Sequence, residues 1–453
     1  MRLSRSLSSI YLRAIHYPQI SRLCCLAVFV GCSVIVGCDA SLDSFKPNLL
    51  VAAKLENSQG VDLQAAVTDS TAALETLFGT PANPNWPAFL KADKNVAELV
   101  SVDRLQPAAG AVRSDEQDRH FGLFREHCVA CHGVAGDGAG PASRLLSPYP
   151  RDFRLGKFKF KSTPIGKKPT RADLRRVLNA GLPGTSMPSF RLLKDDELEA
   201  LVDYVIYLSA RGEVERQLLT EAAIEIDYSA GERLFDVSLK ESKPDEFESQ
   251  WSLLEKSTKG VIKQWTEEED SVTRVTLPAD YPIFTADETF TGEQAQRLAA
   301  SIENGRKLFA GPIANCASCH GATAMGDGQT NNYDAWTKDW LEGLDPQNRE
   351  DIRPMLTLGA LKPQHILPRN LRTGVYRGGS EPNDLYLRIV NGIDGTPMPA
   401  TAMQPANPQG LSEFDVWDLV NFLLSLPHEA ISKDAGMTAP TKPTDSPKST
   451  EAI

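Results

Sequence analysis

The same pattern, Cys-x-x-Cys-His, occurs twice in this chain, at residues 128–132 and residues 316–320. An apolar segment of helical period precedes each copy, and a second amphipathic segment follows each copy at a distance. One copy alone would also be compatible with a redox dithiol or with half of a zinc site. Two copies on matching scaffolds instead predict a small repeated module, in which two thiols and one imidazole hold the same group.

Thiols at this spacing can form thioethers to the two vinyl groups of one porphyrin, and the adjoining histidine then lies under the iron as its proximal ligand. The pattern therefore predicts two covalently bound haem c groups, each with its iron. The expected attachment residues are Cys128, Cys131 and His132 in the first module and Cys316, Cys319 and His320 in the second.

Methionine is the candidate for the opposite face of each iron. Met187 is the only methionine between the two motifs, and it lies in a Gly/Pro-rich loop before the closing helix of its module. In the second module Met398 repeats the Gly-Thr-x-Met-Pro setting of Met187, so we assign Met398, with Met403 as the rival. Core packing is the more common role of a methionine. Met325 and Met355 are the other two methionines of the second module.

Other ligands and partners stay open. His120 or His365 could replace a methionine, although each is a single histidine that surface or core packing also explains. Arg151 and Arg369 could pair with haem propionates, because a guanidinium presents a fork that matches a carboxylate. Ordinary solvent-exposed arginines would look the same in the sequence.

The N-terminus predicts export. A basic start without acidic residues leads into an apolar run over residues 23–37, which is too short for a membrane span of about 20 residues and suits a signal peptide. The run ends in a sequence that resembles the lipobox of bacterial lipoproteins, which implies that Cys38 carries lipid. We therefore expect a protein anchored by lipid at the periplasmic face of a bacterial membrane. The alternative is an ordinary cleaved signal or a short anchor.

Cysteine usage and composition fit this expectation. Of the eight cysteines, three lie in the apolar run, one is Cys38 and four belong to the haem motifs, so no pair is left for a disulfide. Hydrophobic residues make up 41% and charged residues 24% of the chain, which is typical of a globular protein. The net charge of −11 argues against nucleic acid as a partner and permits steering toward a basic redox protein.

The chain divides into six expected segments: a signal peptide (1–37), an N-terminal spacer (38–110), a first haem domain (111–212), an inter-domain segment (213–290), a second haem domain (291–430) and a disordered tail (431–453). Helices are expected over residues 63–78, 115–127, 195–210, 246–265, 293–309 and 411–426, with Ser412 or the Gly410 region as the cap of the last helix. The stretch between His320 and Pro368 is long for a loop, so we expect it to fold locally.

Residues 114–211 and 295–428 resemble class I cytochrome c. The run from Cys128 to Pro141 is similar to the family's C-x-x-C-H-G-x-x-G-x-G-x-G-P sequence, and the second module holds a looser copy. The resemblance implies an all-α fold in which crossed terminal helices cradle one haem with His and Met ligands. The family's glycine in the leading helix is present as Gly305, whereas His120 takes that place in the first module.

We therefore expect an electron carrier without catalytic residues, which links a quinol-oxidising complex or another respiratory donor to an acceptor such as a terminal oxidase. A dihaem cytochrome c peroxidase is the enzymatic alternative, and it would need one iron with an open or displaceable face. A haem subunit of a larger oxidoreductase, with residues 39–110 and 213–290 as its interface, is the third hypothesis.

Overall fold

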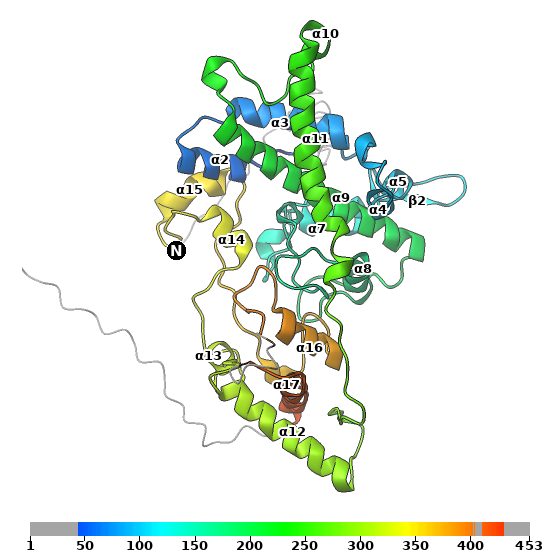
Figure 1. The fold of residues 1–453 in the computed structure, drawn as a ribbon, viewed down its shortest axis with the longest axis vertical. Helices are drawn as coiled ribbons and strands as arrows, with labels where there is room; N and C mark the ends of the chain where they lie inside the picture. Colours follow the sequence, from blue (N-terminus) through cyan, green and yellow to red (C-terminus); the bar gives the residue numbers. More distant parts are fainter. Residues whose placement is uncertain (1–43, 402, 404–409, 430–453) are drawn as a thin grey trace, which may run out of the picture. The chain divides into compact units, whose positions relative to one another are not determined.

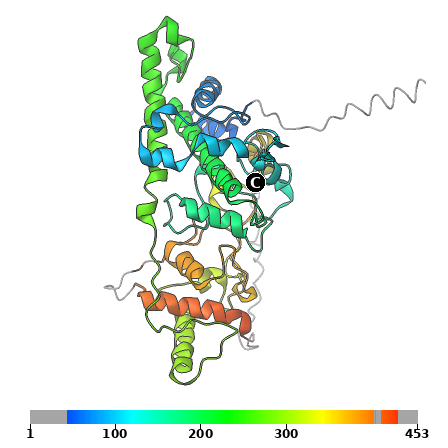
Figure 2. The same ribbon diagram turned by 90° about the vertical axis from the view of Figure 1, so that its right-hand side faces the viewer.

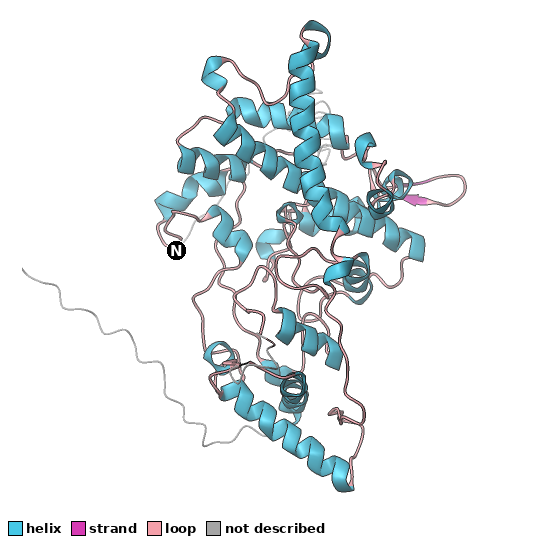
Figure 3. Cartoon of the chain, viewed as in Figure 1, coloured by secondary structure: helices cyan, strands magenta, loops and turns pink. Residues whose placement is uncertain are grey.

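The structure is a computed structural model that describes residues 44–401, 403 and 410–429. Helices dominate this part of the chain (Figure 3), and the expected all-α fold is confirmed. In the described ranges one short antiparallel hairpin, β1 (Arg113–Ser114) with β2 (His120–Phe121), is the sole sheet, and no helix is both long and apolar enough to cross a bilayer. The expected signal peptide, Cys38 and the C-terminal tail lie outside the described residues.

The elements follow the chain from blue to red in Figure 1. The α-helices are α2 (Leu49–Gln59), α3 (Gln64–Phe78), α4 (Lys94–Leu99), α5 (Val102–Ala108), α6 (Leu123–His127), α7 (Val129–His132), α8 (Arg171–Ala180), α9 (Asp195–Glu225), α10 (Leu239–Ser242), α11 (Pro244–Thr266), α12 (Gly292–Ala310), α13 (Ala317–His320), α14 (Ala335–Trp340), α15 (Arg349–Thr357), α16 (Pro382–Asn391) and α17 (Glu413–Ser425). The 3₁₀ turns are η1 (Ala88–Leu90), η2 (Ser143–Leu145), η3 (Phe153–Leu155), η4 (Tyr228–Ala230), η5 (Glu269–Ser271), η6 (Leu371–Thr373) and η7 (Leu426–His428).

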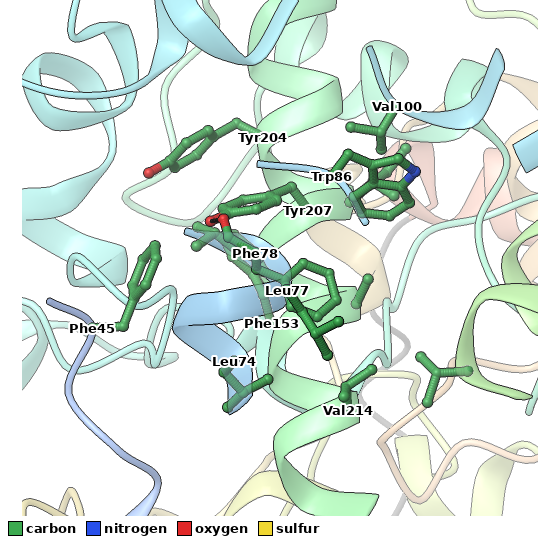
Figure 4. Packing of buried hydrophobic residues seen from close by; sticks show 14 of the residues in the cluster. Phe45, Leu74, Leu77, Phe78, Trp86, Val100, Phe153, Tyr204, Tyr207 and Val214 are labelled. Carbon is green, nitrogen blue, oxygen red and sulfur yellow. Dashed lines mark hydrogen bonds between the residues drawn. The ribbon is translucent and has the colours of Figure 1, made fainter. Parts of the chain in front are cut away.

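Helix α9 organises the first half of the fold. We expected it to end near Ala210, but it continues to Glu225 because its apolar period continues through Val214 and Leu218, which are both fully buried. Helices α2, α3, α5 and α11 pack against it. Figure 4 shows the aromatic part of this core, where the Tyr207 hydroxyl donates a hydrogen bond of 2.7 Å to the carbonyl of Phe78. The expected spacer thus contributes to the same core as the first haem module.

The helix expected over residues 115–127 is largely wrong. Residues 113–121 form the β1–β2 hairpin, and only α6 remains of the expected helix. Gly122 separates the two with a left-handed φ of 76°, and a side chain there would overlap the backbone of Ala111. The spacing of Phe121, Leu123 and Phe124 matched a helical period. These residues do not form one helix, because the left-handed Gly122 lies between Phe121 and Leu123.

In the second module α12 and α17 cross as the resemblance implied. The two helices lie across one another in Figures 1 and 2. They meet at Gly305, where an added Cβ would lie 2.1 Å from the carbonyl oxygen of Asp418. A capping box between Ser412 and Asp415 starts α17, which agrees with the expected cap. In the first module, where His120 takes the place of the glycine, the leading helix is reduced to the short α6, which contacts α9.

Several contacts join the haem modules. The stretch after His320 folds locally into α14 and α15, as expected, and it brings Trp336 to the first module. There the Trp336 Nε1 donates a 2.9 Å hydrogen bond to the carbonyl of Asp152. A buried ion pair also links the modules, with 2.9 Å between Lys161 Nζ and Asp394 Oδ2. The interface between the modules is therefore polar and specific.

Candidate haem sites

The two motif histidines have the same backbone partner. His132 Nδ1 lies 3.0 Å from the carbonyl oxygen of Arg151, and His320 Nδ1 lies 3.1 Å from the carbonyl oxygen of Arg369. Since a carbonyl oxygen can only accept a hydrogen bond, Nδ1 carries the proton. The unprotonated Nε2 is then free to bind a metal. Metal-bound histidines are commonly oriented in this way. Both arginines matter here through their main chain, which the sequence did not indicate.

Burial keeps these imidazoles neutral. Desolvation lowers the pKa of His132 to about 4, and it also lowers the pKa of His320. A neutral imidazole is the form that binds a metal. Phe153 of η3 stacks on His132 with 4.6 Å between the ring centres, which fixes the plane of the ring.

A single helical turn places the motif side chains together. The His132 N–H donates 2.8 Å to the carbonyl of Cys128, and the His320 N–H donates 2.9 Å to the carbonyl of Cys316. Residues three and four positions apart share one face of such a turn. Cys128, Cys131, Cys316 and Cys319 are all free thiols, so four sulfur atoms are available for thioethers.

The two methionine loops are built alike. The N–H of Met187 donates 3.1 Å to the Thr185 hydroxyl, and that hydroxyl donates 2.8 Å to the carbonyl of Leu182. In the second module Met398 and Thr396 repeat these contacts at 3.2 and 2.8 Å, the latter to Ile393. A pair of threonine hydrogen bonds therefore sets the direction of each methionine.

One continuous cavity of about 450 Å³ contains both sets of side chains. This size is typical of cofactor pockets, roughly 300–1,000 Å³. The predicted site residues that line it are Cys128, Cys131, His132, Met187, Cys316, Cys319, His320 and Met398. The structure thus brings together every expected haem residue, and it places the two modules' sites in one space.

The rival methionines lie elsewhere. Met355 is buried in the core of the α14–α15 region, and Met325 is 43% exposed. Met403 packs against the core of the second module and is not part of the cavity lining. The positions of these three methionines favour Met398 as the methionine ligand of the second site.

The two alternative histidines have other contacts. His120 Nε2 lies 2.6 Å from a carboxylate oxygen of Glu126. His365 stacks on Tyr333 with 4.5 Å between ring centres. Neither His120 nor His365 lines the cavity. Their positions therefore do not support either histidine as an iron ligand.

Positive side chains also line the cavity, and they complete its fit to haem. The Nε atoms of Arg369 and Arg377 are buried with no hydrogen-bond partner among the described residues. Unpaired buried donors of this kind are rare in native proteins. Haem propionates would supply the missing acceptors for these arginines. The cysteine thiols would attach the porphyrin, and the histidine imidazoles and methionine thioethers would bind the iron. The residues fit two haem c groups.

Comparison with known families agrees with this geometry. The family model described as cytochrome c matches residues 121–209 and residues 302–427, slightly under half of the chain. This chain contains two cytochrome c domains. Domains of this family carry covalently bound haem c and transfer electrons, so the two matched regions imply one haem c in each.

A search of the curated proteins found no significant match. Among solved structures, a chain of the Kuenenia stuttgartiensis reducing HAO-like protein complex Kustc0457/Kustc0458 is similar, with 22% sequence identity and a TM-score of 0.40. The likeness covers 70% of this chain and 99% of that chain. A likeness this distant carries no conclusion about function.

Proposed function

We propose that this two-haem cytochrome relays electrons outside the cytoplasm, from a respiratory donor such as a quinol-oxidising complex to an acceptor such as a terminal oxidase. The observation that carries the proposal is the single cavity that holds both Cys-x-x-Cys-His sets and both methionines. When haem is bound, its iron exchanges one electron at a time between the ferrous and ferric states, so no substrate is bonded or cleaved.

The chain's own residues suit a carrier better than a peroxidase. Each site offers an imidazole held by a backbone carbonyl and a methionine held by a threonine, on loops of the same design. A thioether is a soft, neutral donor that favours ferrous iron and raises the potential. Peroxide chemistry would need an open face with an acid or base above it, and neither site is distinguished from the other in that way.

Absorption spectra of the purified protein in both oxidation states test the proposal. We expect low-spin haem in both states and a weak near-infrared band from methionine–iron bonding. Met187→Ala and Met398→Ala should each remove part of this band, whereas the matched control Met403→Ala should leave it intact. A high-spin ferric spectrum that changes on adding peroxide would favour the peroxidase, and protein mass showing fewer than two added haems would contradict the two-site assignment.

The proposed location rests on the N-terminal sequence. A lipid on Cys38 would keep the cytochrome at the periplasmic face of a bacterial membrane, close to membrane-bound donors and acceptors. Palmitate labelling of cells that express the full chain should mark the wild type and not Cys38→Ser. Equal labelling of both would show that this cysteine is not the anchor.

A subunit role in a larger oxidoreductase finds less support. Phe45, Trp86 and Trp265 of the two segments without haem motifs are almost completely buried in the chain's own core. The largest aromatic side chains of these segments are therefore already covered, and the exposed apolar residues that remain, such as Ile224, Val237 and Leu277, are scattered along the chain. A free-standing relay is the simpler proposal.

A further inference from the structure

Lys159 is a buried basic residue that forms no ion pair with any described residue, although the charge of Asp334 acts on it from a distance. Its side chain is in a residue only 9% exposed, it lines the haem cavity, and no ion pair or hydrogen bond of its ammonium group is found within the described ranges. The nearest aromatic contact is the Trp336 ring, whose centre is 5.4 Å from Lys159 Nζ. A buried charge that lacks a partner is strongly destabilising, so a carboxylate in the cavity would favour the charged form of Lys159.

Four arginines line the cavity beside Lys159. Arg388 donates hydrogen bonds to the main-chain carbonyls of Lys159 and Lys161, and the other three are left to act with Lys159. Together they form the intermodule cation cluster: Arg151 and Lys159 from the first module, Arg369 and Arg377 from the second. The members interact electrostatically. Desolvation is the largest cause of the lowered pKa of Lys159, and the positive charges of Arg151 and Arg377 lower that pKa further. Arg377 is affected by Arg369 in the same sense. One electrostatic unit thus spans both modules.

Two of the three carboxylates near the cluster are already engaged in ion pairs. Asp152 holds Arg154 through two hydrogen bonds of 3.0 and 2.9 Å. Asp394 pairs with Lys161. Asp334 accepts the N–H of Thr337 at the start of α14, at 3.0 Å, and it is the remaining carboxylate whose charge acts on Arg151 and Lys159.

The chain therefore leaves the cluster with an excess of positive charge that faces the cavity. The buried Nε atoms of Arg369 and Arg377, which have no partner among the described residues, point to the same deficit of acceptors.

We propose that the intermodule cation cluster binds propionate carboxylates of both haem groups, so that one set of charges serves two redox centres. Guanidinium and ammonium groups are the usual partners of carboxylates in water-poor sites. The sharing follows from the single cavity and from the contribution of cations by each module. This inference rests on the proposed two-haem carrier.

The test is Lys159→Met in the full-length protein loaded with haem, followed by potentiometric titration at the haem absorption bands. Removing a buried positive charge disfavours the added electron, so we expect both midpoint potentials to fall. A tenfold shift in each one-electron equilibrium corresponds to about 59 mV. Repeating the titration in a Met187→His background, which lowers the potential of the first haem, tells the two centres apart.

Lys157→Met is the matched control, because Lys157 is exposed two positions away on the same loop. It should leave both potentials unchanged, and Lys159→Arg should retain most of the wild-type values. If Lys159→Met does not fold, Arg377→Gln on the other module should lower both potentials in its place.

A fall at one haem alone, no fall at either, or an equal fall in the control would overturn the shared site. Failure of the carrier proposal would look different, as high-spin or missing haem bands before any titration.

Discussion

The guanidinium carbon of Arg151 lies 3.2 Å from the centre of the Trp336 indole ring, and this contact joins the two haem modules. The same indole donates its Nε1 hydrogen to the carbonyl of Asp152. Its far edge lies against the second methionine loop, where an added Cβ on Gly395 would be 2.3 Å from the ring. Because the carbonyl of Arg151 orients His132, one side chain touches the supports of both sites.

A reciprocal contact runs the other way. The first methionine loop meets Arg369, whose Nη2 would be 2.9 Å from a Cβ added to Gly184. Arg369 in turn orients His320 through its carbonyl. Each module's methionine loop therefore packs on the elements that support the other module, and substitutions here should be felt at both sites.

Trp336 should be important for the stability of the interface. Trp336→Phe removes the Nε1 hydrogen bond and should lower the free energy of unfolding by about 1 kcal/mol. Trp336→Ala also removes the ring and should lower it by about 3 kcal/mol. Denaturant unfolding of the two variants measures the difference. Equal losses would mean that the ring contributes nothing beyond its hydrogen bond.

The buried pair of Lys161 and Asp394 should be costly to break. Asp394→Asn leaves an uncompensated buried ammonium, so we expect a loss of about 3–5 kcal/mol in unfolding free energy. Glu246→Gln, which breaks an exposed pair with Lys243, should change it by less than about 1 kcal/mol. The double variant Lys161→Met with Asp394→Leu should recover part of the loss. No recovery would argue against a charge effect.

Replacing each of two helical glycines by alanine should change the free energy of unfolding in opposite directions. Gly305→Ala forces a methyl group into the crossing of α12 and α17 and should destabilise the protein by about 2–3 kcal/mol. Gly260→Ala on α11 meets no atom within 4 Å and should stabilise it by up to about 1 kcal/mol. Thermal or denaturant unfolding compares them. A neutral Gly305→Ala would show that the crossing is looser than described.

The threonines behind the methionines should control ligand exchange. Thr185→Ala removes both hydrogen bonds that position Met187, each worth about 1 kcal/mol. Added imidazole should then displace this methionine about five- to thirty-fold more readily. Optical titration with imidazole measures the change. Ser186→Ala, on the exposed neighbouring residue, is the control and should titrate like the wild type.

Glu268 should make stability depend on pH. Burial raises its pKa from 4.5 to about 7, and its Oε2 has no hydrogen-bond partner among the described residues. Between these values the folded protein holds a proton that the unfolded chain has lost, so the free energy of unfolding falls as the pH rises from about 4.5 to 7. Glu268→Gln should remove this fall, whereas Asp270→Asn should preserve it. An unchanged slope in Glu268→Gln would assign the effect to another group.

Local signals in the sequence predicted most of the site. The spacing of Cys128 and His132 is dictated by the chemistry of thioether attachment, and the repeated Gly-Thr-x-Met-Pro loops singled out Met187 and Met398. Gly305 was informative for a physical reason, because only glycine lets the two helix backbones come so close.

Features that depend on distant contacts were not predictable. The extension of α9 to Glu225 depends on cover from helices far away in sequence, and the role of Lys159 depends on arginines of the other module. The supporting groups of His132 are main-chain carbonyls, which any residue type would provide. The β1–β2 hairpin was missed because helical spacing persists across Gly122.

The length of α9 has a consequence for how the protein matures. Its first half borders the first haem cavity through Val205, and its second half is covered by α11, whose Trp265 is fully buried. A nascent chain that has emerged only to Glu225 still lacks that cover. Attachment of the first porphyrin would then act on an incompletely packed segment, and the enclosure of that porphyrin would await the residues that follow.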